Sequence, residues 1–271
     1  MEERNEKIKH SNSCQNIRQK NNSDATYNNK YLEKNTSPTN LVEGITLVNG
    51  VEEVVECGVC FTNSIRINGL PGPYTAVLVD GTPMYGNLAS VYGLNGIPTS
   101  IINRFEVIKG PSSTLYGSEA VAGVINIITK NPETQPFLTL DVMGTTHEES
   151  FGNLTLAPKF GKWNGYVGLD YAYINEFHDN NEDGFGDFVN LDRYSVFSKW
   201  SLKRKNDKKF NLFAKYYYED RRNGVEDYVV DRAYRKLRGS DEIYGESIYT
   251  KRLEFFGTYE LPTVENFKLD F

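Results

Sequence analysis

Apolar and polar residues alternate through the second half of the chain. The alternation is clearest where every second side chain is large and apolar: Val167, Leu169, Tyr171 and Tyr173 alternate with Gly168, Asp170 and Ala172. A period of two predicts β-strands with two unlike faces, at 137–146, 150–160, 164–175, 193–204, 208–219, 248–261 and 265–271. About ten alternating residues per strand, with tyrosines near strand ends, is typical of membrane β-barrels, although a soluble antiparallel sheet with one wet face shows the same pattern.

The links between these predicted strands differ in length. Those at 161–163, 205–207 and 262–264 are short, as is the first, at 147–149, whereas 176–192 and 220–247 are long. Outer-membrane barrels have short turns on one side and long loops on the other, so we expect the long links to face outside. About seven strands are too few to close a barrel, and the last one ends at Phe271. Because an open edge cannot lie in lipid, we expect a fragment, a truncated gene product or one part of a split reading frame.

Short apolar runs separated by Gly, Pro and Asn occupy residues 41–130. They predict strands at 65–67, 75–79, 105–108 and 124–129, and short helix or strand segments at 41–48 and 51–55. Pro98 is placed to begin a short helix, and Ser112 to cap another that ends at Gly117. The predicted fold is a small α+β domain, which by itself does not specify a function.

Residues 1–40 are rich in Asn, Lys, Glu and Ser and contain no apolar cluster. We expect them to be disordered or a foreign leader. No apolar segment follows the start, so no secretory signal peptide is visible.

Composition narrows the classes of function. The chain has 271 residues, a net charge of −6 and no prominent basic run, which argues against nucleic-acid binding. No apolar run approaches 18 residues, so no transmembrane helix is predicted, while half-polar barrel strands stay compatible. The 18 Tyr, 15 Phe and 23 Gly favour β-structure. No nucleophile–base pair or phosphate-binding loop is evident, so no catalytic residue is predicted.

The segment IRINGLPGPYTAVLVDGTPMYG, followed by IPTSIINRFEVIKGPSSTLYGSEAVAGVINIITKNP, resembles the plug domain of TonB-dependent outer-membrane receptors. The resemblance covers about residues 64–132. It implies an α+β plug domain at 41–132 and, at 137–271, the N-terminal part of an antiparallel transmembrane β-barrel. It also implies a place in the outer membrane, contact with its lipid and TonB-driven uptake of a scarce solute without enzymatic chemistry. Typical solutes are iron–siderophore complexes, haem and cobalamin. The alternatives are a non-transporting remnant or a soluble plug-like binding module, and no TonB box is evident.

The resemblance also suggests which residues act. Ligand contacts are expected on two plug-apex loops, 70–74 and 82–96, at Tyr74, Met84, Tyr85 and Tyr92. The plug signature comprises charged, glycine and amide positions: Arg66, Gly69, Asp80, Gly81, Arg104, Glu106, Lys109, Gly110, Gly117, Gly123 and Asn126. We expect its charges to pair with one another or with the barrel wall. Lys109 stands where the family commonly has Arg, which keeps the charge but loses the fork geometry.

Two further constellations have structural alternatives. Cys57 and Cys60 form a CxxC motif for which a local disulfide is the favoured interpretation; free thiols, a redox pair and half of a metal site are the alternatives. Asp179, Asn181, Asp183 and Asp187 have spacing similar to a Ca²⁺ loop, although position 12 is Asn190 rather than Glu. The alternative is an acidic solvated loop, and no other cofactor is predicted. The Arg-rich segment 221–238 is either a solvated loop face or a surface that attracts anions.

Overall fold

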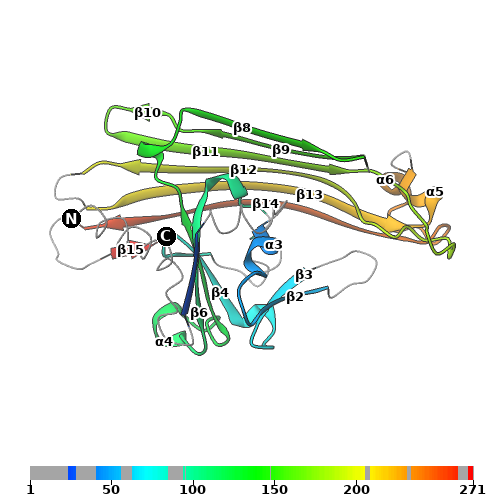
Figure 1. Ribbon diagram of the computed structural model, residues 1–271, viewed down its shortest axis with the longest axis horizontal. Coiled ribbons are helices and arrows are strands. Elements are labelled where there is room, and N and C mark those ends of the chain that lie inside the picture. The colour runs from blue at the N-terminus through cyan, green and yellow to red at the C-terminus, as the bar shows by residue number, and fades with distance from the viewer. Residues whose placement is uncertain are drawn as a thin grey trace, which may run out of the picture. The chain divides into compact units, whose positions relative to one another are not determined.

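The computed structural model divides the chain into two compact units (Figure 1). The first unit is Met1–Val54, Ser64–Leu94 and Ile102–Lys130, and the second is Val55–Asn63, Asn95–Ile101 and Asn131–Phe271. The structure describes residues 24–28, 41–55, 63–84, 94, 96–146, 148–204, 208–230, 233–261 and 268–270.

A five-stranded sheet forms the centre of the first unit. Its order is β1 (Asp24–Asn28), β6 (Ile102–Lys109), β7 (Gly123–Thr129), β4 (Thr75–Val79) and β5 (Thr82–Met84). Strands β4 and β7 are parallel, and the other neighbours are antiparallel. All five residues of β4 are buried, which explains why its sequence is a continuous apolar run rather than an alternating one. The strands predicted at 75–79, 105–108 and 124–129 are therefore confirmed.

Strand β1 corrects the prediction of a disordered leader. Asp24–Asn28 pairs antiparallel with β6, in register from Asp24 opposite Ile108 to Asn28 opposite Arg104. Strand pairing uses backbone groups, so a polar segment can complete a sheet edge without contributing to a core. The remainder of residues 1–40 lies outside the described part of the chain.

Short elements complete the first unit. Helix α3 (Leu41–Ile45) is followed by a two-stranded sheet of β2 (Val51–Val55) and β3 (Asn63–Ile67), and the 3-10 helix η1 (Gly72–Tyr74) precedes β4. Helix α4 (Ser113–Tyr116) ends at Gly117, as predicted. Ser112 precedes this helix, but its hydroxyl donates to the carbonyl of Gly110 instead of capping the helix, so the capping prediction was wrong. Within the described residues, no helix has the length and apolarity needed to cross a membrane.

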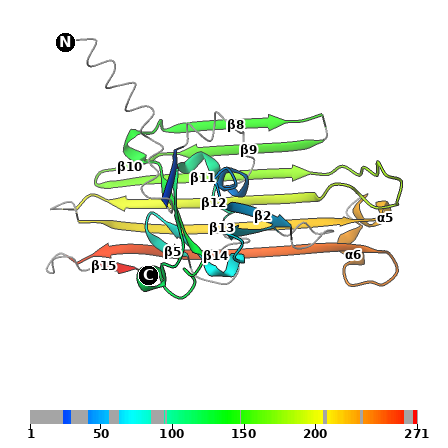
Figure 2. The same ribbon diagram turned by 60° about the horizontal axis from the view of Figure 1, so that its bottom comes forward.

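One antiparallel sheet forms the second unit (Figure 2). Its order is β15 (Lys268–Asp270), β14 (Gly245–Glu260), β13 (Phe210–Gly224), β12 (Asn190–Leu202), β11 (Trp163–Ile174), β9 (Glu149–Leu156) and β8 (Leu138–Gly144). The strand predicted at 150–160 is broken at Pro158, which has no N–H group to donate, and continues as β10 (Lys159–Phe160) beside β11. Helices α5 (Glu226–Val229) and α6 (Tyr234–Leu237) lie in the link between β13 and β14. The 3-10 helices η3 (Thr99–Ile101) and η4 (Pro132–Thr134) also belong to this unit.

The two faces of this sheet differ as the alternation predicts. The outward face has exposed apolar and aromatic side chains, with Leu253 64% and Phe255 67% exposed, and also includes Leu169, Tyr171 and Tyr194. The inner face has buried polar and charged side chains: Asp170, Arg193, Lys199, Lys215 and Glu219. Apolar outward and polar inward is the arrangement of a membrane barrel wall.

Candidate functional site

The Asp80–Gly81 turn anchors the carboxyl ends of two parallel strands in the plug. Asp80 has a positive φ of 51° after β4, and its Oδ1 accepts a hydrogen bond from the backbone N–H of Thr129 at 2.9 Å. Its Oδ2 accepts from the Thr129 hydroxyl at 2.7 Å. Because Thr129 ends β7, these two bonds tie the ends of β4 and β7 together. The Asp80 carboxylate thus holds Thr129 through both its backbone and its side chain.

A chain of polar contacts continues from this turn into β6. The backbone N–H of Gly81 donates to Asn126 Oδ1 at 3.0 Å, and Asn126 Nδ2 donates to Glu106 Oε2 at 3.0 Å. The Arg104 guanidinium donates to Glu106 Oε1 at 2.8 Å. The structure thus joins four predicted signature residues, Gly81, Arg104, Glu106 and Asn126, in one network that links the β4–β5 turn to β7 and β6.

The other two signature cations lie elsewhere in the plug. Lys109 Nζ donates to the backbone carbonyl of Asn49, a point contact that does not need the fork of an arginine. Arg66 lies on β3, and its buried Nε has no hydrogen-bond partner within the described residues. The prediction that the signature charges pair with one another thus holds for Arg104 and Glu106.

The signature glycines serve the backbone. Gly69, Gly81, Gly110 and Gly117 lie in turns with positive φ. Gly123 begins β7, and a Cβ atom there would lie 2.4 Å from the backbone oxygen of Ile108. Only a residue without a side chain allows this approach of β7 to β6.

The predicted ligand contacts are only partly described. Tyr74, at the end of η1, is 48% exposed, and its contact with a ligand stays a prediction. Met84 lies at the end of β5, opposite Val77, and is only 4% exposed. The prediction of an exposed ligand contact at Met84 was therefore wrong. The position of Met84 in a strand that continues the sheet explains the burial. Tyr85, Tyr92, Cys57 and Cys60 lie outside the described residues.

The acidic loop between β11 and β12 is held by hydrogen bonds from its own backbone. Asp179 accepts from the N–H groups of Asp183 at 3.1 Å and Gly184 at 2.8 Å. Asp187 Oδ2 accepts from the backbone and side-chain amides of Asn180. No cluster of three or more His, Cys, Asp or Glu in the described chain is arranged to hold a metal ion. Ca²⁺ binding at Asp179, Asn181, Asp183 and Asp187 stays a prediction.

Residues 96–101 pack on the inner face of the sheet, although their sequence lies within the plug. The Thr155 hydroxyl donates to Ser100 Oγ at 2.9 Å, and the Tyr166 hydroxyl donates to the Ser100 carbonyl at 3.4 Å. A Cβ atom at Gly168 would lie 2.8 Å from Ile101, so the glycine makes room for this segment. The sequence predicted a short helix here but no association with the strands.

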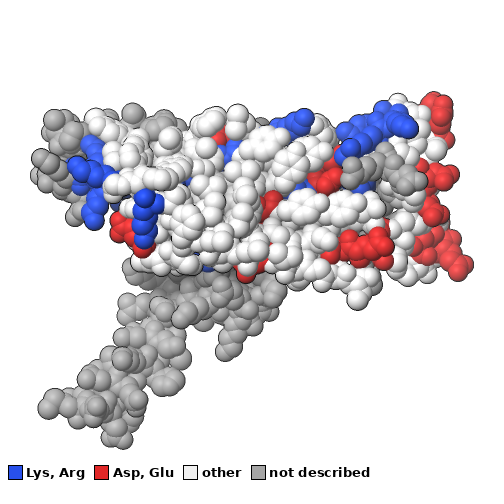
Figure 3. Space-filling view, turned by 90° about the horizontal axis from the view of Figure 1, so that it is seen from above, with Lys and Arg blue, Asp and Glu red and all other residues white. Residues whose placement is uncertain are grey.

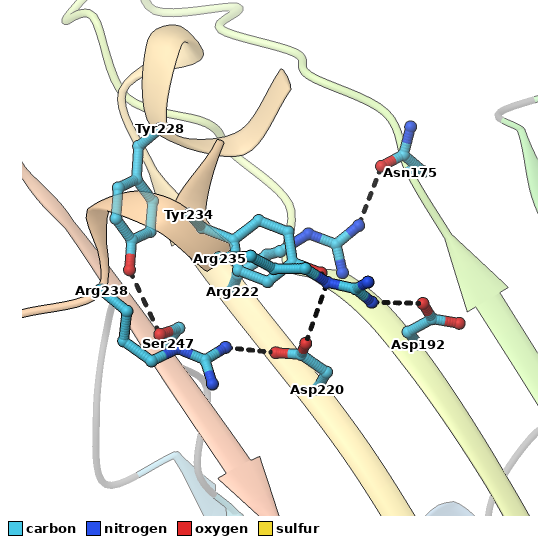
Figure 4. Close-up of polar contacts among 9 residues, drawn as sticks. All are labelled: Asn175, Asp192, Asp220, Arg222, Tyr228, Tyr234, Arg235, Arg238 and Ser247. Atoms are coloured by element: carbon cyan, nitrogen blue, oxygen red, sulfur yellow. Dashed lines mark hydrogen bonds and ion pairs between the residues drawn. The ribbon is translucent and has the colours of Figure 1, made fainter. Parts of the chain in front are cut away.

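The Arg-rich link between β13 and β14 folds onto the outward face of the sheet (Figure 4). Tyr234 of α6 is fully buried, and the Arg222 guanidinium lies 4.4 Å from its ring centroid. Arg238 donates to Asp220 Oδ1 at 2.8 Å, and Arg235 lies 3.8 Å from Asp192 and 3.9 Å from Asp220. The hydrogen bond from Arg235 Nε to the Tyr234 hydroxyl raises the pKa of this guanidinium above its ordinary value.

Sequence reasoning identified the basic segment but missed its carboxylate partners. Asp192, Asp220 and Arg222 occupy outward positions of β12 and β13, in segments that were predicted to belong to the long links 176–192 and 220–247. Asp220 and Arg222 are buried and Asp192 is half-buried, because Tyr234, Arg235 and Arg238 of the link lie against them. The signal that could have found them is the change from tyrosines to charges along the outward positions of β13, at Asp220 and Arg222.

Comparisons with known proteins agree with this architecture. Residues 16–124 match the TonB-dependent receptor plug domain, a match that begins within the segment predicted to be a leader. Over 159 residues the chain is 37% identical to the vitamin B12 transporter BtuB of Vibrio vulnificus (strain CMCP6), covering 52% of this chain and 26% of that protein. The chain thus spans about a quarter of the length of this relative.

Solved structures share the fold. The ferric enterobactin receptor PfeA of Pseudomonas aeruginosa aligns with a TM-score of 0.61 at 19% identity, covering 89% of this chain and 39% of PfeA. FpvA of P. aeruginosa, bound to a pyoverdine–iron complex, aligns with a TM-score of 0.62 at 14% identity, covering 91% and 33%. The copper transporter OprC aligns with a TM-score of 0.61 at 14% identity, covering 94% and 37%. Residues 16–124 are thus similar to the plug domain of TonB-dependent receptors, and the chain shares the fold of the solved receptors with which it aligns.

Proposed function

We propose that this chain serves in the TonB-dependent uptake of a metal chelate across the outer membrane. The observation that carries the proposal is the joining, in one chain, of a plug domain to strands with an apolar outward face and a polar inner face. No bond of the solute is made or broken in such transport, so we propose no enzymatic activity.

The relatives support a solute that contains a metal. Their names specify vitamin B12, ferric enterobactin, a pyoverdine–iron complex and copper. A chelate of this kind is large and partly apolar, and aromatic side chains on exposed turns suit it. Tyr74, exposed on the turn before β4, is the described side chain that we propose as a ligand contact.

The inner face of the sheet suits the passage of a polar solute. Lys215 is 1% exposed and its Nζ lies 3.0 Å from Glu254 Oε2, while Arg221 lies 3.3 Å from Glu219. Paired charges along a wall can exchange partners with water and with a passing solute. An apolar inner wall would offer no such partners.

Uptake measurements test the proposal. The chain is expressed in a Gram-negative host that lacks its own receptors for cobalamin and for iron chelates, with and without functional TonB. We expect uptake of labelled cyanocobalamin, ferric enterobactin or ferric pyoverdine that depends on TonB. A Tyr74→Ala variant should lower affinity for the transported chelate without lowering the amount of protein in the outer membrane. Tyr116→Ala, which changes an aromatic residue elsewhere in the plug, is the matched control.

The same experiment separates the alternatives. Insertion into the outer membrane is followed by fractionation and by the heat-dependent mobility of folded barrels. Insertion without uptake of any of these chelates would contradict the proposed solute class. Failure to insert would instead support a non-transporting remnant, and a soluble periplasmic product that binds a chelate would support a plug-like binding module.

A further inference from the structure

The two long links of the sheet contact each other where their strands end. The first link joins β11 to β12, and the second joins β13 to β14. Phe185 of the first link forms an isolated antiparallel bridge with Val225 of the second. The backbone N–H of Gly186 donates to the carbonyl of Gly224 at 3.0 Å. This junction therefore connects the links through their backbones, as neighbouring strands of a sheet are connected.

Asn223 fastens the junction through its side chain. It lies near the end of β13 and is 5% exposed, and its Nδ2 donates to the carbonyl of Gly186 at 2.8 Å. Its Oδ1 accepts from the backbone N–H of Gly224 at 2.9 Å, which fixes the orientation of the amide. Separation of the links would take the Gly186 carbonyl away from this buried amide. Because a buried polar group without its partner is costly, the amide favours the joined state.

Three glycines let the backbones approach closely at the junction. A Cβ atom at Gly186 would lie 2.7 Å from Asn223 Oδ1, and one at Gly224 would lie 2.6 Å from the Cα of Gly245. A Cβ atom at Gly245 would collide with the ring of Tyr228. Packed contacts of this kind do not deform continuously, so the links are either joined in this way or separated.

Aromatic side chains of the first link pack on the second link. Phe177 packs against the buried cluster that α5 and α6 form. The rings of Phe185 and Tyr244 meet edge to face, with their centroids 5.3 Å apart. Such pairs add to the stabilisation that burial of the rings provides. Movement of one link away from the other would lose these contacts together with the hydrogen bonds of the junction.

The charges of the two links oppose the junction. Figure 3 shows Asp and Glu side chains gathered at the end of the sheet that carries α5 and α6. Exposed carboxylates belong to both links, at Glu182 and Asp183 in the first and at Glu226 and Asp227 in the second. Because like charges repel, the hydrogen bonds and the packing of the junction must outweigh this repulsion.

We propose that the junction makes the two long links one rigid rim, and that the rim stays joined while the solute passes. The rim comprises the described residues 175–189, 225–230 and 233–244. Neither link then moves as a separate lid, and the solute meets a surface that is already formed, which lowers the cost of ordering on binding. The part that concerns solute passage rests on the proposed function, whereas the joining of the links does not.

Hydrogen exchange of the full chain, folded in detergent, tests whether the links are joined. The test variant N223D keeps the Oδ1 acceptor but removes the Nδ2 donor to Gly186. The matched control N211D lies in the same strand and keeps the acceptor that serves the Ser201 hydroxyl. We expect the Gly186 amide to exchange at least about tenfold faster in N223D, and within about twofold of the unaltered rate in N211D. The Tyr228 amide of the second link should also exchange faster in N223D.

Two results of this measurement would overturn the rim. One is an unchanged exchange rate at Gly186 in N223D. The other is faster exchange at Gly186 with no change at Tyr228, which would show that the links move separately. If N223D does not fold, G186A tests the same junction, because its Cβ atom would displace Asn223. Its control is G152A, where a Cβ atom meets no other atom within 4 Å.

A disulfide between the links tests whether they stay joined during uptake. The variant is F185C/V225C with the three natural cysteines replaced by serine, because residues opposite each other in an antiparallel bridge are close enough for a disulfide. We expect TonB-dependent uptake by the oxidised form within about twofold of the reduced form. Uptake by the reduced form alone would overturn the claim that the rim stays joined. Absence of uptake in the unaltered chain as well would contradict the proposed function, and hydrogen exchange would still decide whether the links form one rim.

Discussion

The guanidinium of Arg222 lies 4.4 Å from the ring centroid of Tyr234, and both side chains are fully buried. Arg222 Nη2 donates to Asn175 Oδ1 at 2.9 Å, but its Nε and Nη1 have no hydrogen-bond partner within the described residues. The ring of Tyr234 therefore supplies much of the stabilisation that this buried charge receives. The contact joins the outward face of β13 to α6 and fixes the fold of the link.

Removing this ring should release the link from the wall. We expect Tyr234→Ala to destabilise the fold of α6 by about 3 kcal/mol, because a buried aromatic side chain and a cation–π contact are both lost. Tyr234→Phe keeps the ring and should cost less than about 1 kcal/mol. The rate of tryptic cleavage after Arg235 and Lys236 measures the difference. Equal cleavage rates for the two variants would show that the ring does not hold the link.

The Asp80–Thr129 pair should be coupled in the stability of the plug. Asp80→Ala removes two hydrogen bonds at the ends of β4 and β7, so we expect a loss of about 2 to 3 kcal/mol. Thr129→Val removes the hydroxyl bond alone and should cost about 1 kcal/mol. A double-mutant cycle read by hydrogen exchange of the β7 amides should give a coupling of about 1 kcal/mol. Strict additivity of the two substitutions would argue against the pair.

Gly123 should tolerate a side chain less well than Gly81. A Cβ atom at Gly123 would collide with the Ile108 carbonyl, so we expect Gly123→Ala to cost about 2 kcal/mol. Gly81→Ala meets no atom within 4 Å but keeps a positive φ of 79°, and should cost about 1 kcal/mol. Exchange of the β6 and β7 amides should rise roughly 30-fold in Gly123→Ala. A smaller effect at Gly123 than at Gly81 would contradict the packing described for β6 and β7.

The acidic loop should keep its fold without a metal. Asp179→Ala removes the acceptor of two backbone N–H groups, so exchange at Asp183 and Gly184 should increase. Glu182→Ala, at an exposed position of the same loop, is the control. We expect EGTA to leave the exchange rates of the unaltered loop unchanged. Slower exchange on addition of Ca²⁺, reversed by EGTA, would instead support the calcium site indicated by the spacing.

The sequence predicted the elements that depend on local patterns. Strand β4 was predicted with its observed bounds because a continuous apolar run is stopped by Asp80-Gly81. Strands β11 to β14 were found from their alternation, although β13 and β14 run further than predicted, toward Gly224 and from Gly245. The outward residues of the β13 extension, Asp220 and Arg222, contact the link rather than lipid, so the extension lacks the alternation on which the prediction relied.

Features that depend on distant partners could not be predicted in this way. Strand β1 is polar and joins the sheet through its backbone, which leaves no hydrophobic signal. The contact of Ser100 with Thr155 joins residues 55 positions apart, and neither type of residue indicates it. Within the candidate site, the pairing of Arg104 with Glu106 was expected, whereas the bridging role of Asn126 and the carboxylate partners of Arg235 and Arg238 needed the structure.

The most direct test of the whole account asks whether β14 crosses the membrane with its outward face in lipid. Single nitroxide labels are placed at Leu253→Cys, Glu254→Cys and Phe255→Cys, with the three natural cysteines replaced by serine, and the chain is reconstituted in lipid vesicles. Oxygen collides most often with labels in hydrocarbon, so its accessibility should be high at 253 and 255 and low at 254. Equal accessibility at the three positions, or greater access of a water-soluble nickel reagent at 253 and 255, would contradict the assignment of these strands to a membrane wall.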